Sequence, residues 1–138
     1  MPTRRVAVAG ASYENDDVVV VDFGSDPDEV SGADVVVVRA EDGDKWGDLV
    51  RDRAPNAVVI VIGESPHKMC EATLFPRARI IGVNDDDEVA PLVDAVLYDR
   101  CSEFETIVRC QGERGLDDEF AKVPVRIGAR GVIEIIER

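Results

Sequence analysis

Short, almost uninterrupted runs of apolar residues, many of them valine or isoleucine, recur along the first two thirds of the chain. Five such runs can be distinguished, at Val6 to Ala9, Val18 to Asp22, Val35 to Val38, Val58 to Ile62 and Ile80 to Val83. Uninterrupted runs are typical of strands that are buried on both faces, as in a parallel sheet covered by helices. The pattern therefore predicts an α/β fold with a mainly parallel sheet.

Three segments between and after these runs have the features of helices. Lys45 to Arg53 would place Trp46 on an apolar side. Pro66 to Thr73 begins with a proline, which is favoured in the first turn of a helix. In Val89 to Leu97 apolar residues recur at helical spacing, and the acidic run from Asp85 to Glu88 before it suits the positive end of a helix dipole. Few helices are thus available to cover the sheet.

The chain after Cys101 has a different, alternating pattern. It predicts strands at Glu105 to Cys110, Glu119 to Ile127 and Val132 to Ile136, with a tight turn from Gly128 to Gly131. We therefore expect a reduced Rossmann-like domain over residues 1–100 and C-terminal antiparallel strands over residues 101–138, packed together as one unit.

The link between the first two strands is short for a nucleotide site. Such a site normally needs a glycine turn after the first strand, a helix that follows it, and an acidic residue at the end of the second strand. Gly10 and Asp22 stand in the right places, but only residues 13–17 separate Ser12 from the second strand. A helical crossover needs about ten to twelve residues. Either the two strands are antiparallel or the link is extended, and in both cases no helix N-terminus would face the phosphates.

The charge of the chain is strongly negative. Acidic residues number 29 against 16 basic ones, the net charge is −13, and arginine greatly outnumbers lysine. A carboxylate-rich surface holds hydrated cations, and salt shortens the range of its self-repulsion, so we interpret it as adaptation to a salt-rich cytoplasm. An ordinary acidic protein is the alternative. This surface disfavours nucleic acid as a partner, and no apolar run is long enough to span a membrane. No export leader precedes Val6, so we expect a cytoplasmic protein.

Cysteine and histidine are too few for a structural metal site. The chain has Cys70, Cys101, Cys110 and a single histidine, His67, without a Cys-x-x-Cys pair. We therefore expect no metal, and we expect free buried thiols in place of a catalytic cysteine. We interpret His67 as a surface residue.

Several motifs, in the same order along the chain, are similar to those of a known enzyme family. Leu116 to Glu137 contains a V-P-V strand, a Gly-x-x-Gly turn and a G-V-x-x-I-I-E strand. Ala54 to Ile62 reads A-P-N-A-V-V-I-V-I, Phe75 to Gly82 reads F-P-R-A-R-I-I-G, and Ser31 to Val38 reads S-G-A-D-V-V-V-V. Together with Val89 to Asp99, which is similar to a late helix, these pieces resemble the lactate/malate dehydrogenase family over most of the chain.

The resemblance implies a Rossmann-type fold, NAD as a possible cofactor and an oligomeric protein. The family reduces a 2-keto acid with a nicotinamide hydride, using a histidine as acid and base, an aspartate that orients it, and arginines that hold the substrate. The positions that the resemblance assigns to cofactor binding are Gly10, Ala11, Ser12, Asp22 and Ser65.

The catalytic parts of the family pattern are missing from this sequence. The family's His-Gly motif should lie between Gly82 and Val89, where only six residues remain. Trp46 stands where the family has a substrate-binding arginine, and Ser65 stands where its T-N-P motif has asparagine. We therefore assign no catalytic residue and expect no hydride transfer.

Three functions follow as hypotheses. The leading one is a non-catalytic scaffold that acts by self-association or with a partner protein, because few helices are available to cover the sheet. The alternative is a binding module for NAD or an adenine nucleotide, or a residual NAD-dependent malate or lactate oxidoreductase. The third is an enzyme of altered chemistry that uses Cys70, His67 or the acidic run from Asp85 to Glu88.

Overall fold

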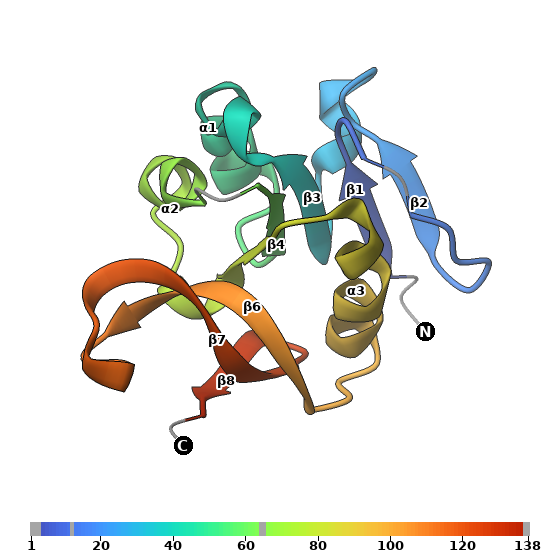
Figure 1. Ribbon diagram of the computed structural model, residues 1–138. Helices are drawn as coiled ribbons and strands as arrows, with labels where there is room; N and C mark the ends of the chain where they lie inside the picture. Colours follow the sequence, from blue (N-terminus) through green and yellow to red (C-terminus); the bar gives the residue numbers. More distant parts are fainter. Residues whose placement is uncertain (1–3, 12, 64–65, 137–138) are drawn as a thin grey trace.

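A computed structural model describes residues 4–11, 13–63 and 66–136, and eight strands within these ranges form one sheet. The strand order is β2-β1-β3-β4-β5-β6-β7-β8 (Figure 1). The parallel part consists of β1 (Arg5–Val8), β2 (Val19–Asp22), β3 (Val35–Arg39), β4 (Val58–Ile62) and β5 (Ile80–Val83). The antiparallel part consists of β6 (Ser102–Gln111), β7 (Asp117–Gly128) and β8 (Gly131–Ile135). The expected α/β fold with a C-terminal antiparallel region is confirmed.

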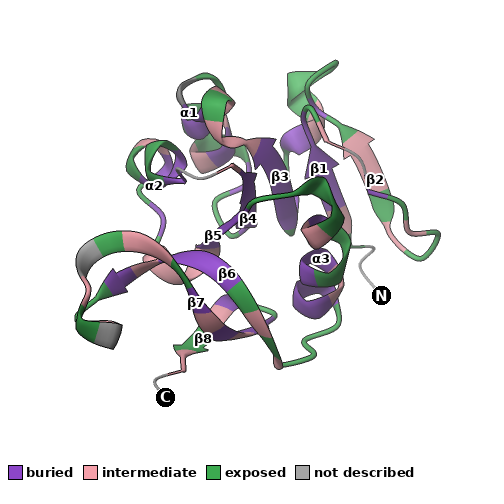
Figure 2. Cartoon of the chain, viewed as in Figure 1, coloured by how far each residue is buried: buried purple, intermediate pink, exposed green. Residues whose placement is uncertain are grey.

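Three helices cover the two faces of the parallel strands. Helices α1 (Gly43–Arg53) and α2 (His67–Thr73) lie together on one face, and α3 (Val89–Leu97) lies on the other (Figure 1). Each face has its own buried apolar cluster, and Figure 2 shows that the central strands between the helices are buried. Because side chains alternate between the faces of a strand, each of the valine and isoleucine runs contributes to both clusters.

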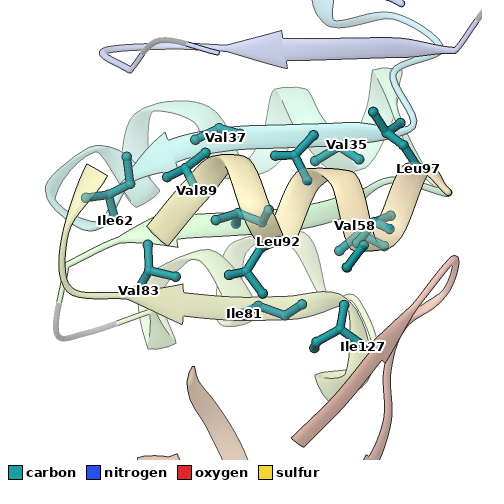
Figure 3. Packing of buried hydrophobic residues seen from close by; sticks show 14 of the residues in the cluster. Val35, Val37, Val58, Ile62, Ile81, Val83, Val89, Leu92, Leu97 and Ile127 are labelled. Carbon is teal, nitrogen blue, oxygen red and sulfur yellow. The ribbon is translucent and has the colours of Figure 1, made fainter. Parts of the chain in front are cut away.

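Helix α3 packs on the centre of one face of the parallel strands. Val89, Leu92 and Leu97 point from it toward the strands below (Figure 3), and all three are buried. Complete burial of one such leucine side chain contributes roughly 1.5–3 kcal/mol. The helix is preceded by a turn in which the Glu88 carboxylate accepts hydrogen bonds from the backbone N–H groups of Asn84 and Asp85, at 2.8 and 3.1 Å. This cap satisfies donors that a helix start would otherwise leave free.

Helices α1 and α2 approach each other closely. A Cβ atom at Gly47 of α1 would collide with the Cβ atom of Ala72 in α2, so the contact requires glycine. The predicted apolar side of α1 is confirmed, because Trp46 and Val50 are buried. The ring of Trp46 also meets that of Phe23 edge-on, with centroids 5.0 Å apart.

The link between β1 and β2 is extended, and the two strands are parallel. Val6 pairs with Val20 and Val8 with Asp22, which excludes the antiparallel alternative. The described residues of the link form no helix. Its anchor is Tyr13, whose buried side chain belongs to the cluster under α3 and whose hydroxyl donates to the Asp94 carboxylate at 2.6 Å. The link is thus too short for a helix, and the side chain of Tyr13 anchors its extended backbone.

Strand β2 differs from the expectation that the strands are buried on both faces. Its residues are exposed or half-buried, and Val19 is 39% exposed. The prediction was wrong here because β2 lies at the edge of the sheet, beyond the helices that cover the central strands (Figure 2).

The C-terminal strands β6 and β7 are longer than predicted and pair along almost their whole length. The predicted turn between β7 and β8 is present, with Gly131 at a φ of +93°. A Cβ atom at Gly131 would collide with the carbonyl oxygen of Ala78, so the turn is packed directly on the backbone before β5. Among the described residues no helix is long and apolar enough to cross a membrane.

Candidate functional site at the carboxyl ends of the parallel strands

The strand order reverses between β1 and β3, because the chain passes from β1 to β2 on one side and returns to β3 on the other. In open parallel sheets, ligands bind in the crevice outside the carboxyl ends of the strands at such a point. Gly10 follows β1, Asp22 ends β2 and Arg39 ends β3. These residues define the candidate site.

Arg39 spans this crevice. Its Nε donates to the carbonyl oxygen of Gly10 at 2.7 Å, and its Nη2 lies 2.9 Å from the carboxylate oxygen Oδ2 of Asp86. The side chain of Arg39 is 34% exposed and that of Asp86 is 59% exposed. We call this arrangement the Arg39 bridge. It joins the end of β1 to the turn before α3 across the point at which the strand order reverses.

The predicted cofactor-binding residues are only partly brought together. Gly10 lies in the crevice with a φ of +71°, a conformation that favours glycine. Ala11 is half-buried and packs against the cluster under α3. Ser12 and Ser65 lie outside the described residues. Their assignment to cofactor binding stays a prediction.

Asp22 is exposed and already has local partners. One carboxylate oxygen accepts the backbone N–H of Gly24 at 2.9 Å, and the other is 3.4 Å from the hydroxyl of Ser25. These contacts shape the turn after β2. An ionised carboxylate has about four acceptor positions, so the residue keeps capacity for a ribose hydroxyl.

The acidic run before α3 makes the same edge of the sheet negative. Within this run, the Glu88 carboxylate forms the helix cap, and the Asp86 carboxylate forms an ion pair with Arg39. Within the part of the chain that the structure describes, no group of three or more His, Cys, Asp or Glu side chains could hold a metal ion. Repulsion by this run disfavours a phosphate group in the crevice.

One prediction about the thiols and the histidine was wrong. His67 is exposed, as expected, at the start of α2. Cys70 and Cys110 are buried, but Cys101 is exposed, contrary to the expectation of buried thiols, because it lies in the turn after α3 at a φ of +55°. Desolvation and the neighbouring Asp99 carboxylate raise the pKa of the Cys101 thiol, which makes it a poorer nucleophile.

Arg39 was not among the site residues predicted from the sequence. The available signal was its position, since it is the first charged residue after the buried run of β3 and therefore stands at the carboxyl edge of the sheet. Its partners could not be inferred, because Gly10 and Asp86 are 29 and 47 positions away.

No family model matches the chain. Over 48 residues it is 46% identical to the malate dehydrogenase of Salinibacter ruber, and over 49 residues 43% identical to that of Haloarcula marismortui. These stretches make up 35% and 36% of this chain but 15% and 16% of the two relatives. The chain therefore matches only about a sixth of the length of these curated relatives.

Solved dehydrogenase structures are similar over nearly all of the chain. The malate dehydrogenase of Aeropyrum pernix has a TM-score of 0.81 at 14% identity, with an alignment that extends over 96% of this chain and 90% of that one. The lactate dehydrogenase of Eimeria maxima, solved with NADH and oxamate, has a TM-score of 0.82 at 12% identity, over 99% of this chain and 88% of that one. The fold is thus shared with these dehydrogenases, and the matching stretch of sequence confirms the resemblance of this chain to the lactate/malate dehydrogenase family.

Proposed function

We propose that this chain is a non-catalytic scaffold with a dehydrogenase fold, which acts by associating with a second copy of itself. The observation that carries the loss of catalysis is the Arg39 bridge, which crosses the crevice in which such sheets bind dinucleotides. A general acid and base also needs a group that orients it. The side chain of His67, the single histidine, makes no hydrogen bond to any of the described residues.

The surface for association is the outer edge of β2. The N–H groups of Val19 and Phe23 donate to carbonyl oxygens of the β1 side, at 2.9 and 3.0 Å. Since backbone groups alternate in direction along a strand, the N–H and C=O groups of Val20 and Asp22 point away from β1. In the dinucleotide-binding sheet with strand order 3-2-1-4-5-6, a further strand pairs at this position. Here β2 is the edge of the described sheet.

A second copy fits this edge because the strand is apolar and self-complementary. Two copies of the Val19 to Val21 run can pair in an antiparallel manner about a two-fold axis, the commonest symmetry of soluble dimers. Asp16 and Asp17 precede the strand and Asp22 ends it, and their charges would approach those of the other copy. Salt screens this repulsion, with a Debye length of about 3 Å at 1 M, so the association should strengthen with salt.

Analytical ultracentrifugation of two variants at Val20 tests the association. Val20→Pro removes the outward N–H and leaves the β1 pairing intact, whereas Val20→Ala shortens the side chain and keeps the N–H. In about 2 M KCl we expect dimers of the wild type and of Val20→Ala, and monomers of Val20→Pro with an unchanged far-ultraviolet circular dichroism spectrum. In about 0.1 M KCl the wild type should dissociate. A wild type that is monomeric at both salt concentrations contradicts the proposal.

A second candidate is a nucleotide-binding module. The favouring observation is that Gly10, with its positive φ, follows β1, and Asp22 ends the neighbouring strand β2, where it pairs with Val8. Calorimetry with NAD, ATP and AMP decides between the candidates. Heat that disappears in Asp22→Asn supports nucleotide binding, and absence of heat at millimolar ligand removes it.

A further inference from the structure

Two arginine side chains meet at an exposed tyrosine where helix α3 ends. The guanidinium carbon atoms of Arg4 and Arg100 lie 5.8 and 5.3 Å from the centre of the Tyr98 ring, and Tyr98 is 42% exposed. Figure 1 shows α3 beside strand β1, which Arg4 precedes. We call these three residues the Tyr98 cluster. It lies at the opposite end of α3 from the acidic run.

The positive charges of the Tyr98 cluster have no counter-ion among the described residues. Acidic residues outnumber basic ones by 29 to 16 in this chain, and Arg5 and Arg77 each pair with a glutamate. By contrast, neither Arg4 nor Arg100 forms an ion pair or a side-chain hydrogen bond with any residue that the structure describes. Two unpaired guanidinium groups beside one ring repel each other, and an anion bound by both would offset this repulsion.

The turn that carries Arg100 is strained and firmly held. Asp99 and Cys101, on either side of Arg100, have φ angles of +46° and +55°, which residues other than glycine rarely adopt. The Asp99 carboxylate accepts the backbone N–H of Ala129 at 2.9 Å, and the backbone N–H of Arg100 donates to the carbonyl oxygen of Ala95 at 3.0 Å. Strained residues that their surroundings hold in place are typical of ligand sites. The turn thus fixes the backbone of Arg100 beside Tyr98.

The Tyr98 cluster also offers a hydroxyl donor and open space. The Tyr98 hydroxyl accepts a side-chain N–H of Asn15 at 2.9 Å, and no described residue accepts its own proton. A hollow of about 180 Å³ opens beside Arg4. Its volume equals that of about six water molecules, at about 30 Å³ each, which leaves room for a phosphate group. The Asp34 carboxylate on its wall accepts the backbone N–H of Arg5 at 2.9 Å, which offsets part of its charge.

We propose that the Tyr98 cluster binds a small diphosphate compound. A guanidinium group forms two parallel hydrogen bonds with phosphate oxygens, and a diphosphate carries charge at both ends, so each end takes one arginine. The Tyr98 hydroxyl donates to a further oxygen of the same ligand. A monophosphate satisfies one arginine and leaves the other unpaired. A nucleic acid is disfavoured, because a net charge of −13 repels an extended polyanion.

Calorimetry with three anions tests the chemistry of the ligand. Inorganic pyrophosphate, inorganic phosphate and citrate are titrated separately, at the lowest KCl concentration at which circular dichroism shows the folded protein, because salt screens the arginine charges. We expect pyrophosphate to bind at least about tenfold more tightly than phosphate, since it engages two guanidinium groups in place of one. Citrate, with three carboxylates, should bind more weakly than pyrophosphate. Equal affinities for citrate and pyrophosphate would overturn the diphosphate in favour of unselective anion binding.

Variants locate the binding and separate it from the crevice at the Arg39 bridge. Arg4→Gln and Arg100→Gln should each weaken pyrophosphate binding by about tenfold, and Tyr98→Phe should weaken it by several-fold. Arg53→Gln removes an exposed positive charge of α1 on the other face of the sheet and should have no effect. Asp22→Asn should also leave the binding unchanged, because the site is independent of the nucleotide crevice and of the scaffold function. The proposal is overturned if pyrophosphate does not bind, if Arg100→Gln and Arg53→Gln behave alike, or if Asp22→Asn abolishes the binding.

Discussion

The Arg39 guanidinium group lies 2.7 Å from the carbonyl oxygen of Gly10, across the point at which the strand order of the sheet reverses. In a dinucleotide-binding protein this backbone turn faces the pyrophosphate, and a helix N-terminus completes the anion site. Here an arginine side chain from the neighbouring strand contacts the turn, and Asp86 holds its other end. Hydrogen bonds within the protein thus span the crevice.

Replacement of Arg39 should destabilise the fold. Arg39→Ala removes a charged hydrogen bond to a backbone carbonyl and a partly exposed ion pair, which together contribute about 1–2 kcal/mol. Urea unfolding followed by circular dichroism measures the change. Arg53→Ala is the control, because its ion pair with Asp28 is long and exposed, and it should change the free energy of unfolding by less than about 0.5 kcal/mol. Equal free energies of unfolding for the two variants would show that the Arg39 bridge does not stabilise the fold.

The hydroxyl of Tyr13 should give the protein an alkaline pH dependence. Burial and the hydrogen bond to Asp94 raise the pKa of Tyr13 to about 12, from 10.0 in an unfolded chain. Because the folded pKa is the higher one, the stabilisation is complete below pH 10.0 and is lost as the pH rises toward about 12. Tyr13→Phe should therefore lower the free energy of unfolding by about 1–2 kcal/mol at neutral pH. The difference from the wild type should shrink over the alkaline range, and a pH-independent difference would contradict this origin.

The contact between α1 and α2 should have room for one methyl group, at residue 47 or at residue 72, and not for two. Gly47→Ala introduces a collision with Ala72 and should cost about 1–3 kcal/mol, although alanine has the better helix propensity. The double variant Gly47→Ala with Ala72→Gly moves the methyl group to the other helix. It should recover at least half of the lost stability in thermal unfolding, and additive losses would mean that the two positions are not in contact.

The excess of acidic residues should make stability depend on salt. With 29 acidic and 16 basic residues, repulsion within the folded protein is strong at low ionic strength and is screened as salt is added. We expect the urea midpoint to rise between about 0.1 and 2 M KCl. Glycerol, an uncharged cosolute, is the control for a general solvent effect. A midpoint that stays constant or falls in KCl would contradict a salt-adapted surface.

The central strands could be predicted from the sequence because their burial leaves a direct pattern. All five residues of Val58–Ile62 are buried, and they form an uninterrupted apolar run. The helix Val89–Leu97 could be predicted equally well, because its buried residues recur at helical spacing. The same rule was wrong for Val19–Asp22, since an apolar run does not reveal whether the strand it forms lies at the centre or at the edge of a sheet.

The long-range contacts, including the Arg39 bridge of the candidate site, could not be predicted, because they join distant parts of the chain. Tyr13 and Asp94 are 81 positions apart, and only the fold shows that α3 lies beneath the link that contains Tyr13. Thr106 presents a similar case. Its place within an alternating strand was evident, but that its hydroxyl has no hydrogen-bond partner among residues 4–11, 13–63 and 66–136 depends on how β6 packs.

The most direct test of a scaffold without catalysis is an assay of NAD-dependent oxidation of malate and lactate by the purified wild-type protein in about 2 M KCl, where screening favours the folded state. A malate dehydrogenase that is active in the same buffer is the positive control. We predict no formation of NADH above the rate without protein for either substrate. Formation of NADH in proportion to the amount of protein would contradict the account.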